Sequence, residues 1–435
     1  MSVMTREFVN LITNQVMRKT VVLFGIAVFL FPLIVTAEEI TLTLEEAIAI
    51  GLRDNRVVLI NAGDVLKAKQ KIREARAGLF PSLSVTGEWA DTRELYSKDT
   101  GQTTARASLK QPLYTGGRTI NTIQMNKYGL VAAQSVLDRT KLELALNIRK
   151  AFFTLLLARD LRDVNKKILK NTQEHVDSLS ERYRGGQASE SDMLRLQASL
   201  SDVRQGYEAS VNQVEAGAAL LCNILSLEEN TAVNPDGVLS FQPQAAAYDE
   251  AFLKALKNRP EIRQYEAQRK AGEKAVAVAK ADGRPGIYAS WDYYSRSHVL
   301  SGTARGWNDY NIAGITVSWP VFDGWATKAK VEQAIVDLKE AGLLKEKAAA
   351  DIALELKNAY LDLRTSLDRI KSVQSQEAVY KDSLAVMRAK YGAGIVSFLD
   401  VQDALLAYEI ALFNEKQAVY DYVTARAIFD KAMGG

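Results

Sequence analysis

The chain has 435 residues, of which 47% are hydrophobic and 25% are charged, so it is neither a disordered chain nor a polytopic helical membrane protein. A formal net charge of +3 is too small for this length to indicate a nucleic-acid partner. The single cysteine, Cys222, excludes an intramolecular disulfide and a cysteine-based metal cluster, and we expect it to be a small buried core residue.

The N-terminal segment has the pattern of a secretory signal. A basic pair precedes an apolar run over 21–35, and the run ends in small residues at 35–37 that resemble a cleavage site. Residues 1–37 are therefore predicted to be a signal peptide that is removed on export. An N-terminal membrane anchor is the alternative, although Pro32 interrupts the short apolar core.

The rest of the chain is predicted to contain two copies of one unit, 38–246 and 247–435. Matching positions are separated by a constant offset, first of 204 and later of 208 residues. The four additional residues fall where an exposed loop would tolerate them. A constant offset over many positions indicates an internal duplication. Matched pairs include Ala47 and Ala251, Pro81 and Pro285, Tyr114 and Phe322, Gly116 and Gly324, and Asp192 and Asp400.

Each copy is predicted to contain the same elements in the same order. An amphipathic helix ends at a proline, two strands follow, and a very long proline-free helix returns through a glycine turn into a second helix. The predicted bounds in the two copies are 44–79 and 248–283 for the first helix, 82–112 and 286–320 for the strands, 117–183 and 325–391 for the long helix, and 190–226 and 398–432 for the last helix, with a linker over 229–246.

The strands alternate apolar and polar residues over about ten positions, which is typical of transmembrane β-strands with one face to lipid and one to a lumen. A soluble hairpin with one wet face shows the same alternation. If the strands do cross a membrane, four per chain are too few, because open sheet edges leave backbone groups unpaired in lipid. Three chains sharing one barrel would supply twelve strands. The predicted interfacial aromatic residues are Trp89, Trp291, Tyr293, Tyr310 and Trp319.

The long helices indicate an extended rod. A helix of roughly 65 residues would be about 100 Å long. Apolar residues recur along it in the narrow stripe of a coiled coil, as at Leu142, Leu146 and Phe153 in the first copy and Leu356 and Leu363 in the second. A rod of that length fits the width of a periplasm.

With these features the sequence resembles the TolC family of outer-membrane efflux proteins. The resemblance covers the mature chain and includes the opening LTLEEAIAIGLRDN (42–55), the blocks QPLYTGGR and WPVFDGWAT after the strands, and both helix turns. It implies a mostly α fold, in which a homotrimer in the outer membrane of a Gram-negative-type cell forms a twelve-stranded barrel and a periplasmic helical tunnel. It also implies a periplasmic adaptor protein and an inner-membrane transporter as partners.

The expected function is a passive exit duct for efflux or type I secretion. The sequence shows no nucleophile elbow or phosphate loop, and we expect neither an enzyme nor a cofactor. The two histidines, His175 within a helix and His298 in a predicted external loop, lack metal-ligand spacing. The alternative function is a periplasmic coiled-coil adaptor or scaffold without a barrel.

The resemblance also assigns roles at the helix turns. The segment 391–404 is similar to the family's tunnel aperture, where Asp400 and Asp403 would form rings of carboxylates and Tyr391 would tie the helix ends closed with Asp192 as acceptor. The alternative for both aspartates is the preference for acids in a helix's first turn. An arginine that some members carry at this turn is Val396 here, so the closing network must differ. The expected adaptor-docking residues are Gly185, Gly186, Ser189, Gly392, Gly394 and Ser397.

Overall fold

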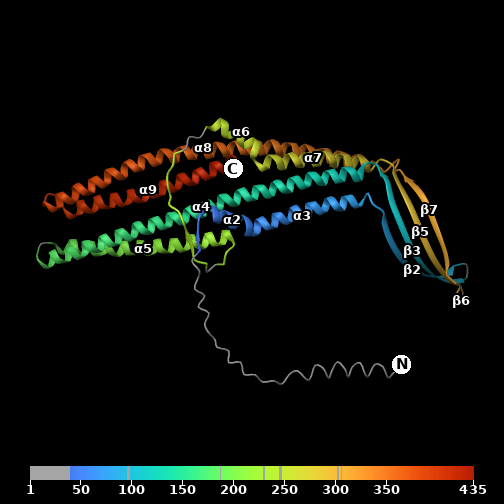
Figure 1. Cartoon of the computed structure of the whole chain (residues 1–435), viewed down its shortest axis with the longest axis horizontal. Helices are drawn as coiled ribbons and strands as arrows, with labels where there is room; N and C mark the ends of the chain where they lie inside the picture. The colour runs from blue at the N-terminus through green and yellow to red at the C-terminus, as the bar shows by residue number, and fades with distance from the viewer. Residues whose placement is uncertain are drawn as a thin grey trace, which may run out of the picture. The chain divides into compact units, whose positions relative to one another are not determined.

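Long helices make up most of the protein and run side by side, with the strands at one end and two helix turns at the other (Figure 1). The computed structural model describes residues 40–95, 98–186, 188–228, 231–243, 247–300, 303–304 and 306–435. They lie within one compact unit, 39–435. The predicted signal peptide, 1–37, falls outside the described residues. Every described helix is too short or too polar to cross a lipid bilayer.

Apart from the short strand β6, the two halves of the unit contain the same succession of elements. The first half has β1 (Ile40–Leu42), α2 (Leu44–Asp54), α3 (Arg56–Ala77), β2 (Ser82–Leu95), β3 (Lys98–Thr115), α4 (Arg118–Arg184) and α5 (Glu190–Leu225). The second half has β4 (Val233–Pro235), α6 (Tyr248–Asn258), α7 (Pro260–Ala281), β5 (Gly286–Leu300), β6 (Thr303–Ala304), β7 (Asn308–Ser318), α8 (Ala326–Gly392) and α9 (Phe398–Ala432). Both α4 and α8 have 67 residues, which is about 100 Å of helix.

The first helix of each half is broken in two, and the prediction of one continuous helix over 44–79 and over 248–283 is wrong. Asn55 is extended, and its side chain accepts a hydrogen bond from the Val57 N–H to start α3. In the second half Arg259 is extended because Pro260 follows it, and a residue before proline is disfavoured in the α conformation. The apolar pattern continues through both breaks, so periodicity alone could not locate them.

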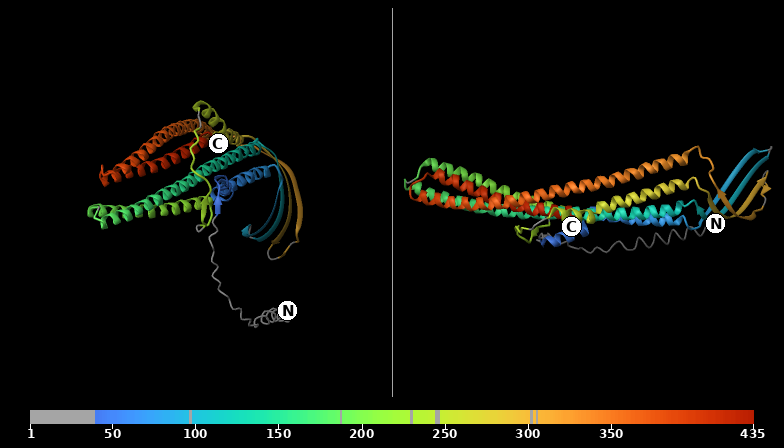
Figure 2. Two further views of the ribbon diagram at one scale, coloured as in Figure 1. Left: turned by 60° about the vertical axis from the view of Figure 1, so that its left-hand side comes forward. Right: turned by 90° about the horizontal axis from the view of Figure 1, so that it is seen from above.

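The helices form a layer whose order is settled by their contacts (Figure 2). Near the strands the order is α3, α4, α7, α8, and toward the turns it is α5, α4, α9, α8. The four long strands form an antiparallel sheet in the order β2, β3, β5, β7, with short β6 also paired to β5. Helices α3 and α8 and strands β2 and β7 are therefore the lateral edges of the chain.

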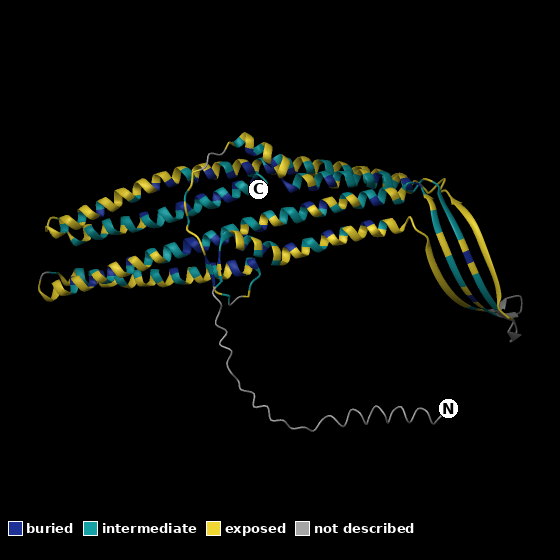
Figure 3. Cartoon of the chain, viewed as in Figure 1, coloured by how far each residue is buried: buried dark blue, intermediate teal, exposed yellow. Residues whose placement is uncertain are grey.

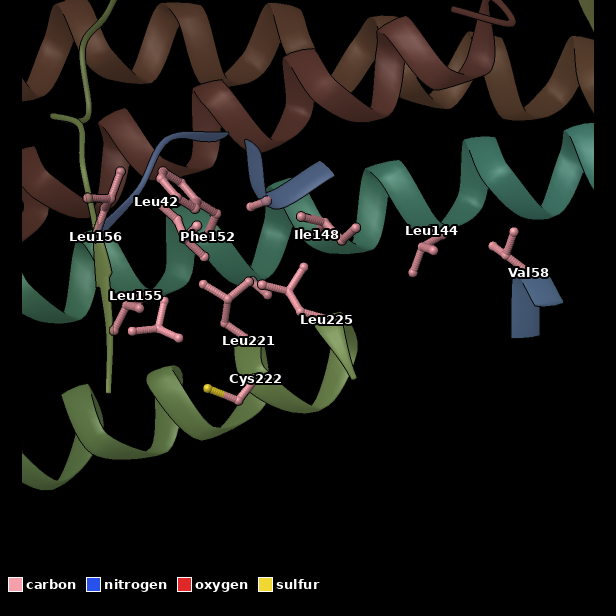
Figure 4. Packing of buried hydrophobic residues seen from close by; sticks show 13 residues of the cluster. Leu42, Val58, Leu144, Ile148, Phe152, Leu155, Leu156, Leu221, Cys222 and Leu225 are labelled. Atoms are coloured by element: carbon pink, nitrogen blue, oxygen red, sulfur yellow. The ribbon is translucent and has the colours of Figure 1, made fainter. Parts of the chain in front are cut away.

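Buried side chains gather midway along the rod, where the short helices pack on the long ones (Figure 3). In the first half Ile148 and Phe152 of α4 meet Leu221 and Leu225 of α5 (Figure 4). Cys222 is 2% exposed in the same cluster, which confirms its predicted core position. A second cluster around α6, α8 and α9 serves the other half. The predicted linker contains β4, which pairs in parallel with β1, and both strands contribute to the first cluster through Val233 and Leu42.

Candidate functional site

The sheet has one apolar face, and strand pairing determines which side chains share it. Leu83 pairs with Leu109, Leu109 with Trp291, and Trp291 with Ala313, so these four side chains form one row. The neighbouring row contains Val85, which is 76% exposed. A row of apolar side chains open to the surroundings matches the lipid-facing side of a membrane sheet.

The opposite face is mostly polar, and two of its basic side chains have partners on the neighbouring strand. Arg106 on β3 forms an ion pair of 2.9 Å with Asp292 on β5 and lies 5.2 Å above the Tyr294 ring. Lys110 similarly lies 4.4 Å above the Tyr288 ring. A sheet with one dry and one wet face can separate lipid from an aqueous lumen.

Tyr310 is the one predicted interfacial aromatic that lies on the wrong face. It pairs with Tyr294, and the two rings stack with centroids 4.9 Å apart on the polar side. The prediction of Tyr310 in a lipid-facing girdle is therefore wrong, because one position of register decides the face of a strand residue. His298, predicted in a loop, lies within β5 and pairs with Gln102.

The sheet also has two open edges. Strand β2 pairs only with β3, and β7 pairs only with β5, in the part of the chain that the structure describes. The outward backbone groups of both edge strands are therefore left for water or another chain. A single copy of this sheet cannot be immersed in lipid as it stands.

At the other end of the rod, the first helix turn joins α4 to α5. Gly186 has a φ of +72°, a left-handed conformation that favours glycine. Ser189 begins α5, and its hydroxyl accepts a hydrogen bond from the Asp192 N–H at 3.2 Å and donates to the Asp192 carboxylate at 2.7 Å. Asp192, predicted to accept a hydrogen bond from Tyr391, instead accepts one from Ser189 in its own turn.

The second turn joins α8 to α9 in the same way. Gly394 has a φ of +75°, and Ser397 and Asp400 form a capping box. The Ser397 hydroxyl and backbone N–H both donate to the Asp400 carboxylate, at 2.7 and 2.8 Å. These hydrogen bonds lower the pKa of Asp400. This carboxylate caps its helix, as the first-turn alternative requires, whether or not it also faces an aperture.

Tyr391 and Asp403 line two different clefts, and His175 lines both. Tyr391 contacts the Phe398 ring at 5.9 Å, and Asp403 lines a cleft of about 340 Å³ between α4, α5 and α9. His175 lines that cleft and a neighbouring one that includes Tyr391 and Arg388. Burial and the Arg388 guanidinium lower the pKa of His175. The sequence did not single out this contact of four helices, because a lone polar residue within a helix carries no signal of what faces it.

Residues 55–225 and 252–435 match the family model for outer membrane efflux proteins. The chain belongs to this family. It is 22% identical over 397 residues to outer membrane protein TolC of Escherichia coli K12, a match that covers 86% of this chain and 78% of the relative. It is 22% identical over 424 residues to the alkaline protease secretion protein AprF of Pseudomonas aeruginosa, covering 88% and 84%.

The fold matches solved members of the same kind. The CmeC outer membrane channel of Campylobacter jejuni superposes with a TM-score of 0.78 at 17% identity, over 90% of this chain and 85% of that one. The outer membrane efflux protein described here is accordingly an outer-membrane channel with a large periplasmic helical domain. The resemblance and the location predicted from the sequence are confirmed.

Proposed function

We propose that this outer membrane efflux protein is the passive exit duct of a three-part export system and that three copies close one twelve-stranded barrel. The observation that carries the proposal is the four-stranded sheet with an exposed apolar face and two open edges. Lipid contact requires every backbone group of the sheet to be paired. Bacterial single-chain barrels have at least eight strands, so a sheet of four needs other copies.

The helical rod supplies the periplasmic tunnel, and its turns are the proposed docking surface for an adaptor protein. Both turns lie at the end of the rod farthest from the strands, where a partner from the inner membrane would arrive (Figure 1). An inner-membrane transporter would supply the energy. The matching family model describes efflux proteins, and AprF is named as a protease secretion protein, so both classes of cargo need testing. A deletion strain tested on a drug panel and for secreted proteins identifies the cargo.

The aperture is proposed to involve Asp403 and Tyr391, with Asp400 and Asp192 in the cap of each turn. Three copies would bring three Asp403 carboxylates toward one axis, and rings of acids attract cations. Asp400 is held by Ser397, so Asp403 is the freer of the two to bind a cation. We therefore expect divalent or trivalent cations added on the periplasmic side to block conductance.

Planar-bilayer recordings of protein purified from outer membranes test both parts. We expect a heat-sensitive trimer that conducts, with cation block relieved by Asp403→Asn combined with Asp400→Asn. Asp403→Asn alone should relieve most of the block, and Asp400→Asn alone should relieve little. Undiminished block in the double variant would refute the aperture assignment, while the trimer and its conductance would still stand.

A periplasmic scaffold was the other function considered from the sequence. It does not account for a sheet whose apolar face is left uncovered by the chain's own helices (Figure 3). Fractionation separates the two functions, because a scaffold would be soluble without detergent. Recovery of the protein in the soluble periplasmic fraction, with no trimer in the membrane extract, would favour the scaffold.

A further inference from the structure

The junction between helix and strands is built alike in both halves of the chain. Gln111 donates a hydrogen bond to the Leu79 carbonyl at 3.0 Å, and Trp319, 208 positions later, donates to the Gly283 carbonyl at 3.2 Å. Gly116 and its counterpart Gly324 have φ values of +65° and +64°. The two junctions are thus structurally equivalent, and an environment found at one predicts the environment of the other.

The same equivalence extends to how the long helices begin. In the first half the Thr119 N–H donates to the Thr115 hydroxyl at 3.3 Å. In the second half the Thr327 N–H donates to the Asp323 carboxylate at 2.8 Å. Both acceptors lie four residues before the donor, so the first turn of α4 and the first turn of α8 are capped in the same geometry.

The surroundings of the two junctions differ sharply. At Gly116 the second half of the chain closes over the loop, and a Cβ placed there would lie 2.8 Å from Arg284 Cβ and 2.9 Å from the Ala281 carbonyl oxygen. Arg284 also donates to the Gly116 carbonyl at 3.1 Å. At Gly324 a Cβ would meet nothing within 4 Å. The second junction lies on the α8 and β7 edge, beyond which no further helix or strand lies among the described residues.

The residues that cover the first junction have counterparts on the opposite edge of the chain, beside α3 and β2. Arg284 corresponds to Phe80, and Ala281 to Ala77, both at the end of α3 beside β2. Phe80 is 66% exposed in the single chain. If a second copy continues the layer as the second half continues the first, its Phe80 falls beside Gly324.

The side chains exposed at the Gly324 junction are aromatic, as is Phe80 of a second copy. Trp325 has a φ of +69° and no side-chain capping bond, at the position where the first half has Gly117 with a φ of +89°. A bulky residue in the left-handed region is strained. Within the chain, the Lys328 ammonium lies 5.7 Å from the centroid of the Trp325 ring. Trp325 and Phe322 are both exposed, with ring centroids 6.1 Å apart, so they offer an aromatic pair to a third ring.

We propose that Phe80 of one copy packs against Trp325 and Phe322 at the Gly324 junction of the next copy, in the way that Arg284 packs against Gly116 within the chain. The inference rests on the proposed trimer and names its contact surface. The contact within the chain is polar, since Arg118 also pairs with Asp282, whereas the contact between copies is aromatic. Polar contacts join the two halves of one chain, and aromatic rings join separate chains.

The long helices give an independent reason to place a second copy on this edge. Leu343 on α8 is 55% exposed, whereas its counterpart Ser135 on α4 is 3% exposed. The Asp138 carboxylate of α4 pairs with Arg263 of α7 at 3.0 Å, and the residue corresponding to Arg263 on the other edge is Leu59, which is exposed. Leu343 on one edge and Leu59 on the other thus lie at positions whose counterparts within the chain are buried or ion-paired.

Cross-linking tests the contact directly. Phe80→Cys combined with Trp325→Cys, treated with a short bis-maleimide in native outer membranes, should yield covalently linked trimers. The matched control combines Phe80→Cys with Trp307→Cys and should yield none, and the wild-type chain offers only buried Cys222. Trimers that form but cannot be linked through the first pair would overturn the inference, and a wild type without trimers would instead refute the proposed function.

Trp325→Gly distinguishes a contact between copies from a role within the chain. Glycine relieves the left-handed backbone, so an internal role predicts an unchanged or more stable protein. We expect instead that Trp325→Gly speeds heat dissociation of the trimer about tenfold, the size of an aromatic contact. Phe80→Ala should do the same, and the double variant should be no faster than either. Additive effects would show that Trp325 faces lipid and would overturn the inference.

Discussion

Midway along the rod, the two halves of the chain make an equivalent contact with different side chains. In each half, one residue lies at the break between the two short helices, α2 and α3 or α6 and α7. Its side chain donates a hydrogen bond to a backbone carbonyl of the last helix, α5 or α9. In the first half Asn55 does so, donating to the Ile224 carbonyl at 2.9 Å. In the second half Arg259 donates to the Lys431 carbonyl at 3.3 Å. The backbone path is shared, but an amide serves one half and a guanidinium the other.

In the second half the contact through Arg259 is part of a network of ion pairs, whereas the equivalent residues of the first half form none. Arg259 is 3% exposed and also pairs with Glu261 and Glu355, at 2.9 and 2.7 Å, while Lys431 pairs with Glu355 at 2.7 Å. The corresponding first-half residues, Val57, Asn147 and Asn223, carry no charge. The two halves therefore share the geometry of this contact but differ in its electrostatics, and the second half should be the more sensitive to single substitutions.

Arg259→Met should have the largest effect. Removal of one partner from a buried ionic network leaves a carboxylate uncompensated, which costs about 3–5 kcal/mol. We expect a marked fall in the thermal midpoint of the helical circular dichroism signal. The matched control replaces all four charges with their first-half residues, as Arg259→Asn, Glu261→Val, Glu355→Asn and Lys431→Asn, and should recover much of the loss. A quadruple variant as unstable as Arg259→Met would mean that the network itself provides the stability.

Asn55→Ala should have a smaller effect in the first half. It removes the cap of α3 and the hydrogen bond to the Ile224 carbonyl, but no charge is left behind. Loss of an N-cap costs about 1 kcal/mol, and a buried hydrogen bond contributes about the same. Hydrogen exchange should quicken in α2 and at the start of α3 while the second half is unchanged. A loss as large as that of Arg259→Met would contradict the contrast drawn between the halves.

The order and lengths of the elements were predictable because their signals are local. Proline and glycine end helices, and the 67-residue helices α4 and α8 agree with the predicted bounds to within one residue. The apolar face of the sheet followed from alternation. The breaks at Asn55 and Arg259 were missed because the apolar stripe runs through both, although Pro260 and the capping side chain of Asn55 are local signals of a helix start.

The candidate site was less accessible to sequence reasoning because it depends on pairing between distant elements. Tyr310 was predicted to belong to an interfacial aromatic girdle, yet strand register stacks it on Tyr294 at the polar face. Asp400 matched an aperture residue, and only the structure shows its bonds to Ser397. A signal for Trp325 was present, since it aligns with Gly117, but its meaning required the left-handed φ at both positions.

Glu266→Gln should have the smallest effect, and its pH dependence gives the sharpest contrast between the halves. Glu266 on α7 bonds Arg269 at 3.0 Å and Lys345 of α8 at 2.8 Å, whereas the first-half counterparts of Glu266 and Lys345 are Ala62 and Leu137. These bonds lower the pKa of Glu266 from 4.5 to about 2. Partly exposed ion pairs of this kind contribute about 1 kcal/mol or less.

The sign follows from the lowered pKa. A carboxylate that ionises more readily in the folded state stabilises the fold fully above pH 4.5, and that contribution disappears as the pH falls through about 2. The thermal midpoint of Glu266→Gln should therefore lie slightly below that of the wild type at pH 7, and the two should converge near pH 2. Ala62→Gln, the matched substitution in the first half, should show no such convergence. A pH-independent gap for Glu266→Gln would mean that side-chain packing, rather than charge, joins α7 to α8.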